Sequence, residues 1–293
     1  MIGHFPTILP DELFYSVCAR YGARVDYSSE RLLLLELFGC EAATATIDLP
    51  ARLNHFASAL PSGSALTADR VIDKNTLLPF HSHFLPSERV KQIRSSMRQS
   101  NGAAPYMCSG LSATRIPAPT HLKFCPKCIR KDQRAFDEPY WHRLHQLSGV
   151  EVCPLHKVFL ENSSVSLRAA RKLHQFVSVE QAFLNPSSRP LDLDDRDHQV
   201  LLRVARDASW LLKHPSKGND LESLYNRYLR ILHDRGLAIF SGNIRVNELL
   251  EQFGDFYSAD LLKMLHCEFS GNNHRKTNWL LKLVRQPRNS HHP

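Results

Sequence analysis

The stretch KFCPKCIRKDQRAFDEPYWHRLHQLSGVEVCPLHKVFL, residues 123–160, decides how the centre of this chain folds. It contains two short motifs of matching form, Cys125-Pro-Lys-Cys128 and Cys153-Pro-Leu-His156, with 24 residues between them. A tight turn lets both ligands of each motif reach one ion, and a proline in the second position stiffens each turn. Three thiolates and one imidazole are a tetrahedral donor set suited to Zn²⁺. The spacing therefore predicts a Cys3His zinc site.

Four protein ligands leave no open position for water, so this zinc is expected to be structural and not catalytic. His142 and His145 are rival ligands in the same stretch. The apolar residues around them occur at helical spacing, which favours instead a helix that packs over the zinc lobe. These apolar residues are Tyr140, Trp141, Leu144 and Leu147.

Composition excludes several other classes of protein. The chain has 293 residues, 43% of them hydrophobic, which is enough for two or three packed units. We expect no membrane association, because the apolar runs are short and the N-terminus lacks the features of a secretory signal. A cytoplasmic location is therefore expected. Thiols stay reduced in the cytoplasm, which favours metal binding over disulfides. The cysteines without neighbours at ligand spacing are interpreted as core residues: Cys18, Cys40, Cys108 and Cys267.

The net charge of the chain is +8 with histidine neutral, and the sequence pI is about 9.2. A positive excess of this size attracts polyanions, of which nucleic acid is the most common. The alternative interpretation is a solvated basic surface without a partner.

The first 40 residues predict two short helices joined by a turn. Such a pair is either part of a helix-turn-helix or an ordinary helical hairpin. Pro10 and Asp11 begin the first helix, Ser28 or Ser29 caps the second, and Gly39 ends it. The side chains expected to face inward are Leu13, Phe14, Val17 and Tyr21, then Leu32, Leu35 and either Leu37 or Phe38.

Short helices are also predicted over residues 52–60, 67–75 and 86–99, followed by an extended connector over 111–122. Residues 185–197 are interpreted as a linker that ends by capping the next helix. Their acidic cluster indicates either a site for a hard metal ion or, more simply, a solvated loop with negative charge at a helix N-terminus. The cluster consists of Asp192, Asp194, Asp195 and Asp197.

The C-terminal third has the clearest helical pattern, with helices predicted before Pro215 and before Gly236. In the next segment a short helix ends near Gly254, and Ser258 can cap another helix that begins at Ala259. Two short amphipathic helices around a glycine turn match a helix-turn-helix better than the N-terminal pair does, and a basic tail follows them.

The predicted fold is mainly α, with helix-turn-helix-like units around a central Cys3His zinc-finger lobe. Three regions are expected: residues 1–110 form an N-terminal helical region, 111–184 the zinc-binding lobe, and 185–293 a C-terminal helical region with the basic tail.

The sequence from FCPKC to CPLHKVFL resembles the defining motif of the TniQ/TnsD family, the target-selection proteins of bacterial transposons. That motif joins a C-P-x-C knuckle, a [YF]W-x-R…HQL-P-G stretch and a CP-x-H knuckle. Ser148 replaces the usual proline before Gly149, which changes a turn and no metal ligand. The segments FPTILPDELFYSVCARYG, residues 5–22, and residues 236–288 also resemble the family, so most of the chain is covered.

The resemblance implies an adaptor that is not an enzyme. Such proteins mark a target on double-stranded DNA, directly or through a CRISPR effector complex, and recruit a TnsC-like AAA+ ATPase. The family's zinc ligands map to Cys125, Cys128, Cys153 and His156. Longer TnsD-like members continue past this sequence, so a short or C-terminally truncated member is expected, which puts independent reading of a DNA sequence in question.

The sequence contains no GxxxxGK[ST] phosphate-binding loop, no G-x-S-x-G nucleophile motif and no H-x-E of the zinc deaminases. Alternatives to the adaptor are a zinc-stapled helix-turn-helix transcription regulator and a metalloenzyme, which would need an open zinc position. DNA phosphates are expected to contact the basic residues after the zinc lobe and near the C-terminus. These are Arg168, Arg171, Lys172, Arg245, Arg275, Lys276, Lys282, Arg285 and Arg288.

Overall fold

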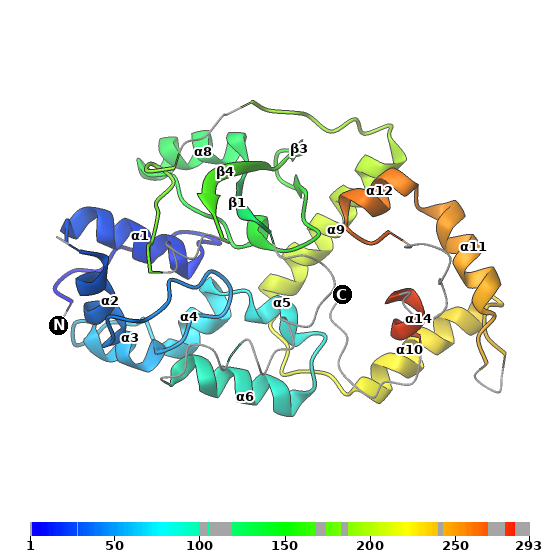
Figure 1. Ribbon diagram of the computed structural model, residues 1–293, viewed down its shortest axis with the longest axis horizontal. Coiled ribbons are helices and arrows are strands. Elements are labelled where there is room, and N and C mark those ends of the chain that lie inside the picture. Colours follow the sequence, from blue (N-terminus) through cyan, green and yellow to red (C-terminus); the bar gives the residue numbers. More distant parts are fainter. Residues whose placement is uncertain are drawn as a thin grey trace.

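Helices make up most of the regular structure of this protein, and two small antiparallel sheets lie among them (Figure 1). The mainly α class predicted from the sequence is therefore confirmed. The protein is analysed as a computed structural model, which describes residues 2–27, 29–99, 105, 119–167, 174–182, 187–239, 243–268 and 279–284.

The N-terminal helices α1–α6 contribute to one hydrophobic cluster and precede the central lobe in the chain. Three of them match the helices predicted over 52–60, 67–75 and 86–99, whereas the short α5 was not predicted. They are α1 (Phe14–Val25), α2 (Glu30–Phe38), α3 (Leu53–Ala59), α4 (Ala68–Asn75), α5 (Leu78–Ser82) and α6 (Ser87–Arg98).

Helices α1 and α2 differ in how well the sequence predicted their buried faces. All four residues predicted to face inward from α1 are buried. In α2, Ser29 caps the first turn and Gly39 ends the helix, as predicted. However, Leu32 and Leu35 are 42% and 41% exposed, so the prediction for these two residues was wrong. Four consecutive leucines give the helical period no preferred face, and packing selected Leu33, Leu34, Leu37 and Phe38 instead.

Two short sheets frame the central lobe. Strands β1 (His121–Phe124) and β4 (Glu161–Ser166) pair antiparallel, with Phe124 opposite Glu161. The hairpin of β2 (Val152–Cys153) and β3 (Val158–Phe159) pairs Cys153 with Val158. Helix α8 (Pro126–Phe136) begins directly after β1. One half of the predicted metal site therefore follows β1, and the other half belongs to the hairpin.

The helix predicted over residues 140–147 is not formed. An extended segment and a single 3₁₀ turn, η2 (Leu144–Gln146), take its place. Backbone groups here pair with the start of the chain: Leu13 N–H donates to Trp141 O (2.9 Å), and Arg143 N–H donates to Asp11 O (2.9 Å). A helix would have used the same groups internally. The apolar side chains of the segment are nevertheless buried, as the predicted packing over the lobe required.

The C-terminal helices are capped largely as the sequence predicted. The Asp195 side chain accepts hydrogen bonds from Asp197 N–H and His198 N–H, so the acidic cluster caps a helix. Its four carboxylates do not gather as a metal-ligand group in the described part of the chain. These helices are α9 (Arg196–Lys213), α10 (Leu221–Asp234), α11 (Val246–Phe256), α12 (Ala259–Met264) and α14 (Trp279–Leu283).

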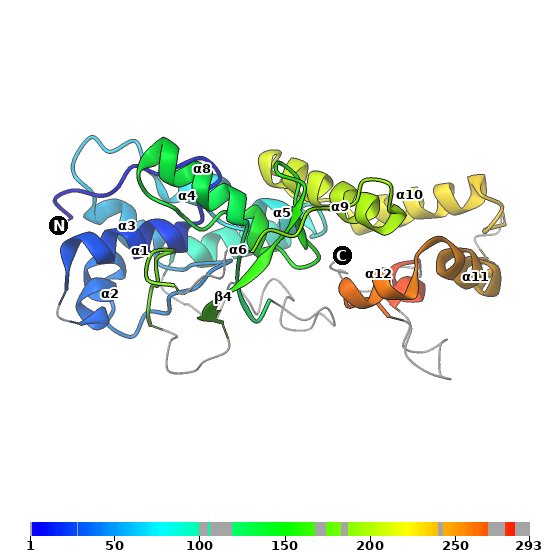
Figure 2. The ribbon, with the colours of Figure 1, turned by 90° about the horizontal axis from the view of Figure 1, so that it is seen from above.

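One continuous hydrophobic cluster runs from the N-terminal helices through the central lobe into α9. A second, smaller cluster joins α10, α11 and α14. In two perpendicular views the helices α1–α3 and α10–α11 lie at opposite ends of an elongated molecule, with α9 between them (Figures 1 and 2). The division into three regions stays a prediction. None of the described helices combines the length and apolarity of a transmembrane span.

Candidate metal centre

The four side chains of the two sequence motifs meet at one point. The ligand atoms of Cys125, Cys128, Cys153 and His156 all lie within 4.8 Å of one another. The three cysteines are buried, and His156 is partly exposed. The Sγ atoms of Cys128 and Cys153 are 3.7 Å apart, and His156 Nδ1 lies 3.3 to 3.7 Å from the three sulfur atoms. The predicted residues are therefore brought together.

These distances fit one tetrahedral ion. With Zn–S bonds of about 2.3 Å and a Zn–N bond of about 2.0–2.1 Å, the tetrahedron has sulfur–sulfur edges of about 3.8 Å and sulfur–nitrogen edges of about 3.5 Å. The Cys128–Cys153 separation of 3.7 Å and the three sulfur–nitrogen separations of 3.3 to 3.7 Å agree with those edges, and all pairs lie within 4.8 Å. The donor set and its spacing thus suit a metal ion that prefers thiolate and imidazole ligands.

The first motif is the beginning of a helix. Cys125 is the N-cap residue of α8, and its Sγ accepts a hydrogen bond from Cys128 N–H (3.4 Å). Pro126 occupies the first helical position, where the missing N–H costs nothing. The unpaired N–H groups of a helix N-terminus also stabilise a nearby thiolate. The motif had predicted only a turn here, and the helix was not predicted.

The second motif lies in the turn of the β2–β3 hairpin. Lys157 N–H donates to Cys153 O (2.8 Å), which closes the turn and directs both Cys153 and His156 towards α8. Lys157 adopts φ of 51°, a left-handed conformation that few residues other than glycine favour. The hairpin thus presents two ligands from a four-residue segment.

His142 and His145, the rival ligands, lie outside the four-atom group. His145 is buried, hydrogen-bonds to Cys153, and has a pKa lowered mainly by burial. His142 Nε2 lies 2.8 Å from Asp132 Oδ2 on α8. Neither ring belongs to the ligand group: His145 contacts the ligand Cys153, and His142 contacts helix α8. Among the other cysteines, Cys18 is buried but Cys40 and Cys267 are only partly buried, and Cys108 is outside the described residues.

The sulfur atoms perturb one another. Hydrogen bonds from the Cys125 and Cys128 thiols lower the pKa of Cys153, whereas hydrogen bonding to Cys125 and Cys153 raises the pKa of Cys128. The neighbouring thiols thus stabilise one thiolate, at Cys153, and a second thiolate beside it in the buried site is disfavoured. A divalent cation removes that conflict, because a coordinated thiol is deprotonated outright.

The predicted DNA-contacting residues lie almost entirely outside the described residues. Arg245 is the exception: it is the N-cap residue of α11, and its Nη1 lies 3.3 Å from Glu248 Oε2. The side chain of Lys282 and all of the following residues lie outside: Arg168, Arg171, Lys172, Arg275, Lys276, Arg285 and Arg288.

Comparison with known families identifies the chain. The sequence profile of the TniQ family matches residues 4–160, which extend from before α1 to the end of β3 and contain all four ligand residues. The chain belongs to the TniQ/TnsD family. A second profile, described as Tn7-like transposition protein D, matches residues 204–293. Together the two profiles cover both the central lobe and the C-terminal helices.

A curated relative gives the same result for this TniQ/TnsD protein. The transposon Tn7 transposition protein TnsD of Escherichia coli is 26% identical over 293 residues, an alignment that covers 97% of this chain. The chain spans about half of that relative, since 54% of the relative is aligned. Both the second profile and this relative are named for Tn7 transposition.

Proposed function

We propose that this chain is a target-selection adaptor for DNA transposition and is not itself the enzyme. It binds target DNA, or a complex that marks the target, and recruits a TnsC-like AAA+ ATPase. The observation that carries this proposal is the alignment with a TnsD protein along 97% of the chain. The two transposition profiles favour the adaptor over a transcription regulator unrelated to transposition.

The Cys3His cluster is proposed to hold Zn²⁺ as a structural ion. Four protein donors within 4.8 Å of one another can complete its coordination, which supports a structural role over a metalloenzyme centre. The bound ion would cross-link the start of α8 to the β2–β3 hairpin. Cys125 and Cys128 would hold it from the helix, and Cys153 and His156 from the hairpin.

Helices α11 and α12 are proposed to form the helix-turn-helix-like unit. Ser258 Oγ accepts a hydrogen bond from Leu261 N–H (3.0 Å), so the second helix begins where the sequence placed it. The basic residues predicted after the zinc lobe and in the C-terminal tail would contact phosphates beside this unit. Arg245 is available for such a contact, because an exposed ion pair with Glu248 stabilises the protein only weakly.

A retention assay on DNA tests the adaptor role. Immobilised target duplex is incubated with a TnsC-like ATPase, with and without the purified chain. We expect retention of the ATPase to depend on the chain, and binding of the chain to weaken steeply as salt rises, because counterions released from phosphates drive it. Operator-specific binding without any effect on the ATPase would instead favour a transcription regulator.

A further inference from the structure

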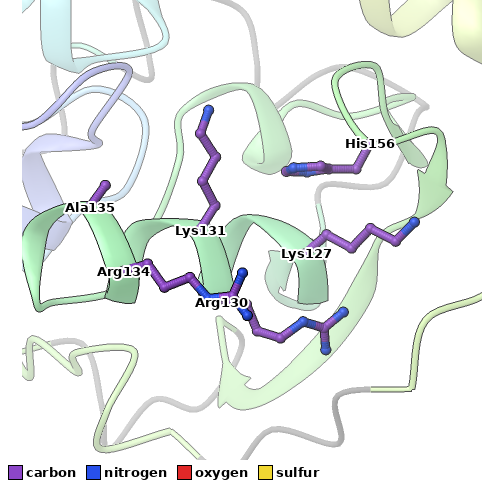
Figure 3. Close-up of a pocket in the computed structure, with 6 residues that line it drawn as sticks. All are labelled: Lys127, Arg130, Lys131, Arg134, Ala135 and His156. Carbon is purple, nitrogen blue, oxygen red and sulfur yellow. The ribbon is translucent and has the colours of Figure 1, made fainter.

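The outer face of α8 carries four basic side chains. Lys127, Arg130, Lys131 and Arg134 are exposed and follow the spacing i, i+3, i+4, i+7, which places them along one side of the helix. With Ala135 and His156 they line an open hollow of about 540 Å³ (Figure 3). We call these four residues the basic face. None of them belongs to the DNA-contacting set predicted from the sequence.

The basic face has no compensating partner among the described residues. None of its four side chains forms an ion pair or a hydrogen bond there. Two of the acidic groups near the face are engaged elsewhere: Asp132 is buried against His142, and Glu138 pairs with Arg20 and Arg24. A third, the exposed Asp137 at the C-terminal end of α8, forms no ion pair with the face in the described part of the chain. Four like charges therefore repel one another until an anion binds.

We propose that the basic face binds the phosphate backbone of duplex DNA. This inference rests on the proposed adaptor function and identifies a surface for it. At a rise of about 1.5 Å per residue, the four residues extend about 10 Å along the helix. A duplex carries one phosphate charge per ~1.7 Å of its axis, so an equal length presents about six charges. Lysine and arginine side chains are the usual partners of such phosphates.

The composition of the hollow favours a polyanion over a protein partner. Its lining contains cationic side chains, one imidazole and Ala135, with no large apolar residue. Binding between proteins usually depends on aromatic or aliphatic anchors in a buried centre, and this lining offers none. Contacts with phosphate need only charge and hydrogen-bond donors.

The candidate metal ligands lie beside the basic face. Cys125 and Cys128 occupy the N-cap and first turn of α8, directly beside Lys127, and His156 lines the same hollow. A helix anchored at this end keeps the first basic side chains at fixed positions relative to the hairpin. The residues of the metal centre would thus preorganise the phosphate-binding surface without contacting DNA themselves.

The test neutralises the basic face in the full chain, with Lys127→Gln, Arg130→Gln, Lys131→Gln and Arg134→Gln combined. Affinity for a fluorescent duplex without any target sequence is measured by anisotropy between about 50 and about 250 mM salt. Each lost phosphate contact reduces the slope of log K against log salt by about 0.9. We expect the slope to fall by two to three and a half units, roughly, and the affinity at low salt by at least about tenfold.

A matched control removes the same charge from other helices. It combines Arg31→Gln, Arg70→Gln, Lys74→Gln and Lys91→Gln, all at exposed positions of α2, α4 and α6. This variant should lose less than about one unit of slope. Zinc content and circular dichroism verify both folds. If the fourfold variant is unstable, the pairs Lys127→Gln/Lys131→Gln and Arg130→Gln/Arg134→Gln replace it, each with about half the effect.

The outcomes separate this inference from the proposed function. Equal losses in both variants would show an effect of net charge alone, and an unchanged slope in the basic-face variant would place the contacts elsewhere. Either result overturns the inference and leaves the adaptor role intact. Retained DNA binding with lost ATPase recruitment would make the basic face a protein contact and also overturn it. A wild-type chain that neither binds duplex nor recruits the ATPase would overturn both.

Discussion

Arg20 lies between two carboxylates at the junction of α1 and the central lobe. Its Nη1 is 2.9 Å from Glu12 Oε2, and its Nη2 is 2.7 Å from Glu138 Oε2. Glu12 is fully buried, and burial raises the pKa of its carboxyl group against the opposing effect of Arg20. Leu9 N–H also donates to Glu12 Oε2 (2.8 Å). Arg20 is therefore the cation that offsets the free-energy cost of burying the Glu12 carboxylate.

Replacing Arg20 should be costly. We expect Arg20→Met to lower the free energy of unfolding by about 3–5 kcal/mol, because it leaves Glu12 buried without a cation. Urea denaturation measures the loss, and adding Glu12→Gln should recover part of it. Arg24→Met is the control, since Arg24 also pairs with Glu138 but is 47% exposed and should cost less than about 1 kcal/mol. Equal losses for the two arginines would contradict this.

Asp48 should make the stability of the folded protein depend on pH. Burial raises the pKa of its carboxyl group from 3.8 to about 6. Between these values the unfolded chain releases the proton while the folded chain keeps it, so stability falls as pH rises from about 4 to about 6. Above about pH 6 the folded protein bears the full free-energy cost of ionising the buried Asp48 carboxyl group. Asp48→Asn keeps an oxygen that can accept from Leu49 N–H (3.0 Å) and cannot ionise.

We therefore expect Asp48→Asn to be more stable than the wild type at about pH 7, by roughly 1–3 kcal/mol at ~1.4 kcal/mol per pKa unit. The difference should vanish near pH 4. Urea midpoints of both proteins across this range measure it, and the comparison cancels the titration of groups common to both. A difference that stays constant with pH would show that ionisation of Asp48 is not its cause.

At the scale of elements, the β2–β3 hairpin is the smallest sheet of the central lobe, and its backbone pairs beyond the hairpin with residues 189–191. Strands β2 and β3 contain two residues each, and an isolated two-stranded hairpin is at best marginally stable in water. Two of the metal ligands belong to this hairpin, and the other two belong to the start of α8. Where an ion is bound at such a site, its binding free energy is folding free energy.

Removing the metal should therefore loosen the lobe. We expect chelation, with loss of zinc verified by elemental analysis, to increase hydrogen exchange at the backbone amides of β2, β3 and the first turns of α8. Amides of α10 and α11 are the internal control, because these helices pack in a separate hydrophobic cluster. Unchanged protection of the lobe after complete removal would refute the structural role of the ion.

At the scale of the whole molecule, the loop between α9 and α10 connects the C-terminal helices to the N-terminal ones. Asn219 N–H donates to Leu85 O (2.8 Å) just before α6. Gly218 has φ of 99°, and a Cβ atom there would lie 2.5 Å from Ser87 Cα. Only glycine permits this backbone conformation and this close approach together. The segments matched by the two family profiles are thus in direct contact.

Gly218→Ala should disturb that contact. We expect a loss of about 2–4 kcal/mol, the sum of the positive-φ penalty and of overpacking against backbone. The control is Gly236→Ala, since Gly236 has φ of 70° but nothing within 4 Å of its would-be Cβ, so only about 1–2 kcal/mol should be lost. Thermal unfolding of the two variants measures the difference. Similar melting temperatures would show that the loop can move away from α6 at no cost.

Features set within a few residues were predictable from the sequence alone. The two ligand motifs, the caps at Ser29, Asp195 and Ser258, and the helices of the C-terminal third all depend on neighbours in the chain. The four metal ligands were found for the same reason, since each pair lies in one local turn. The basic face was missed because α8 was expected to be only a turn, although its spacing was already helical.

Other features were decided only by tertiary structure. Residues 140–147 have a helical pattern, but their backbone pairs with residues 11–16, and no local signal encodes a partner so distant in the chain. Packing between elements likewise determined which leucines of α2 are buried. It also brought His145 into contact with Cys153. The physical reason is that local patterns fix the period and the ends of an element. Which face becomes buried depends on the surface that another part of the chain presents to it.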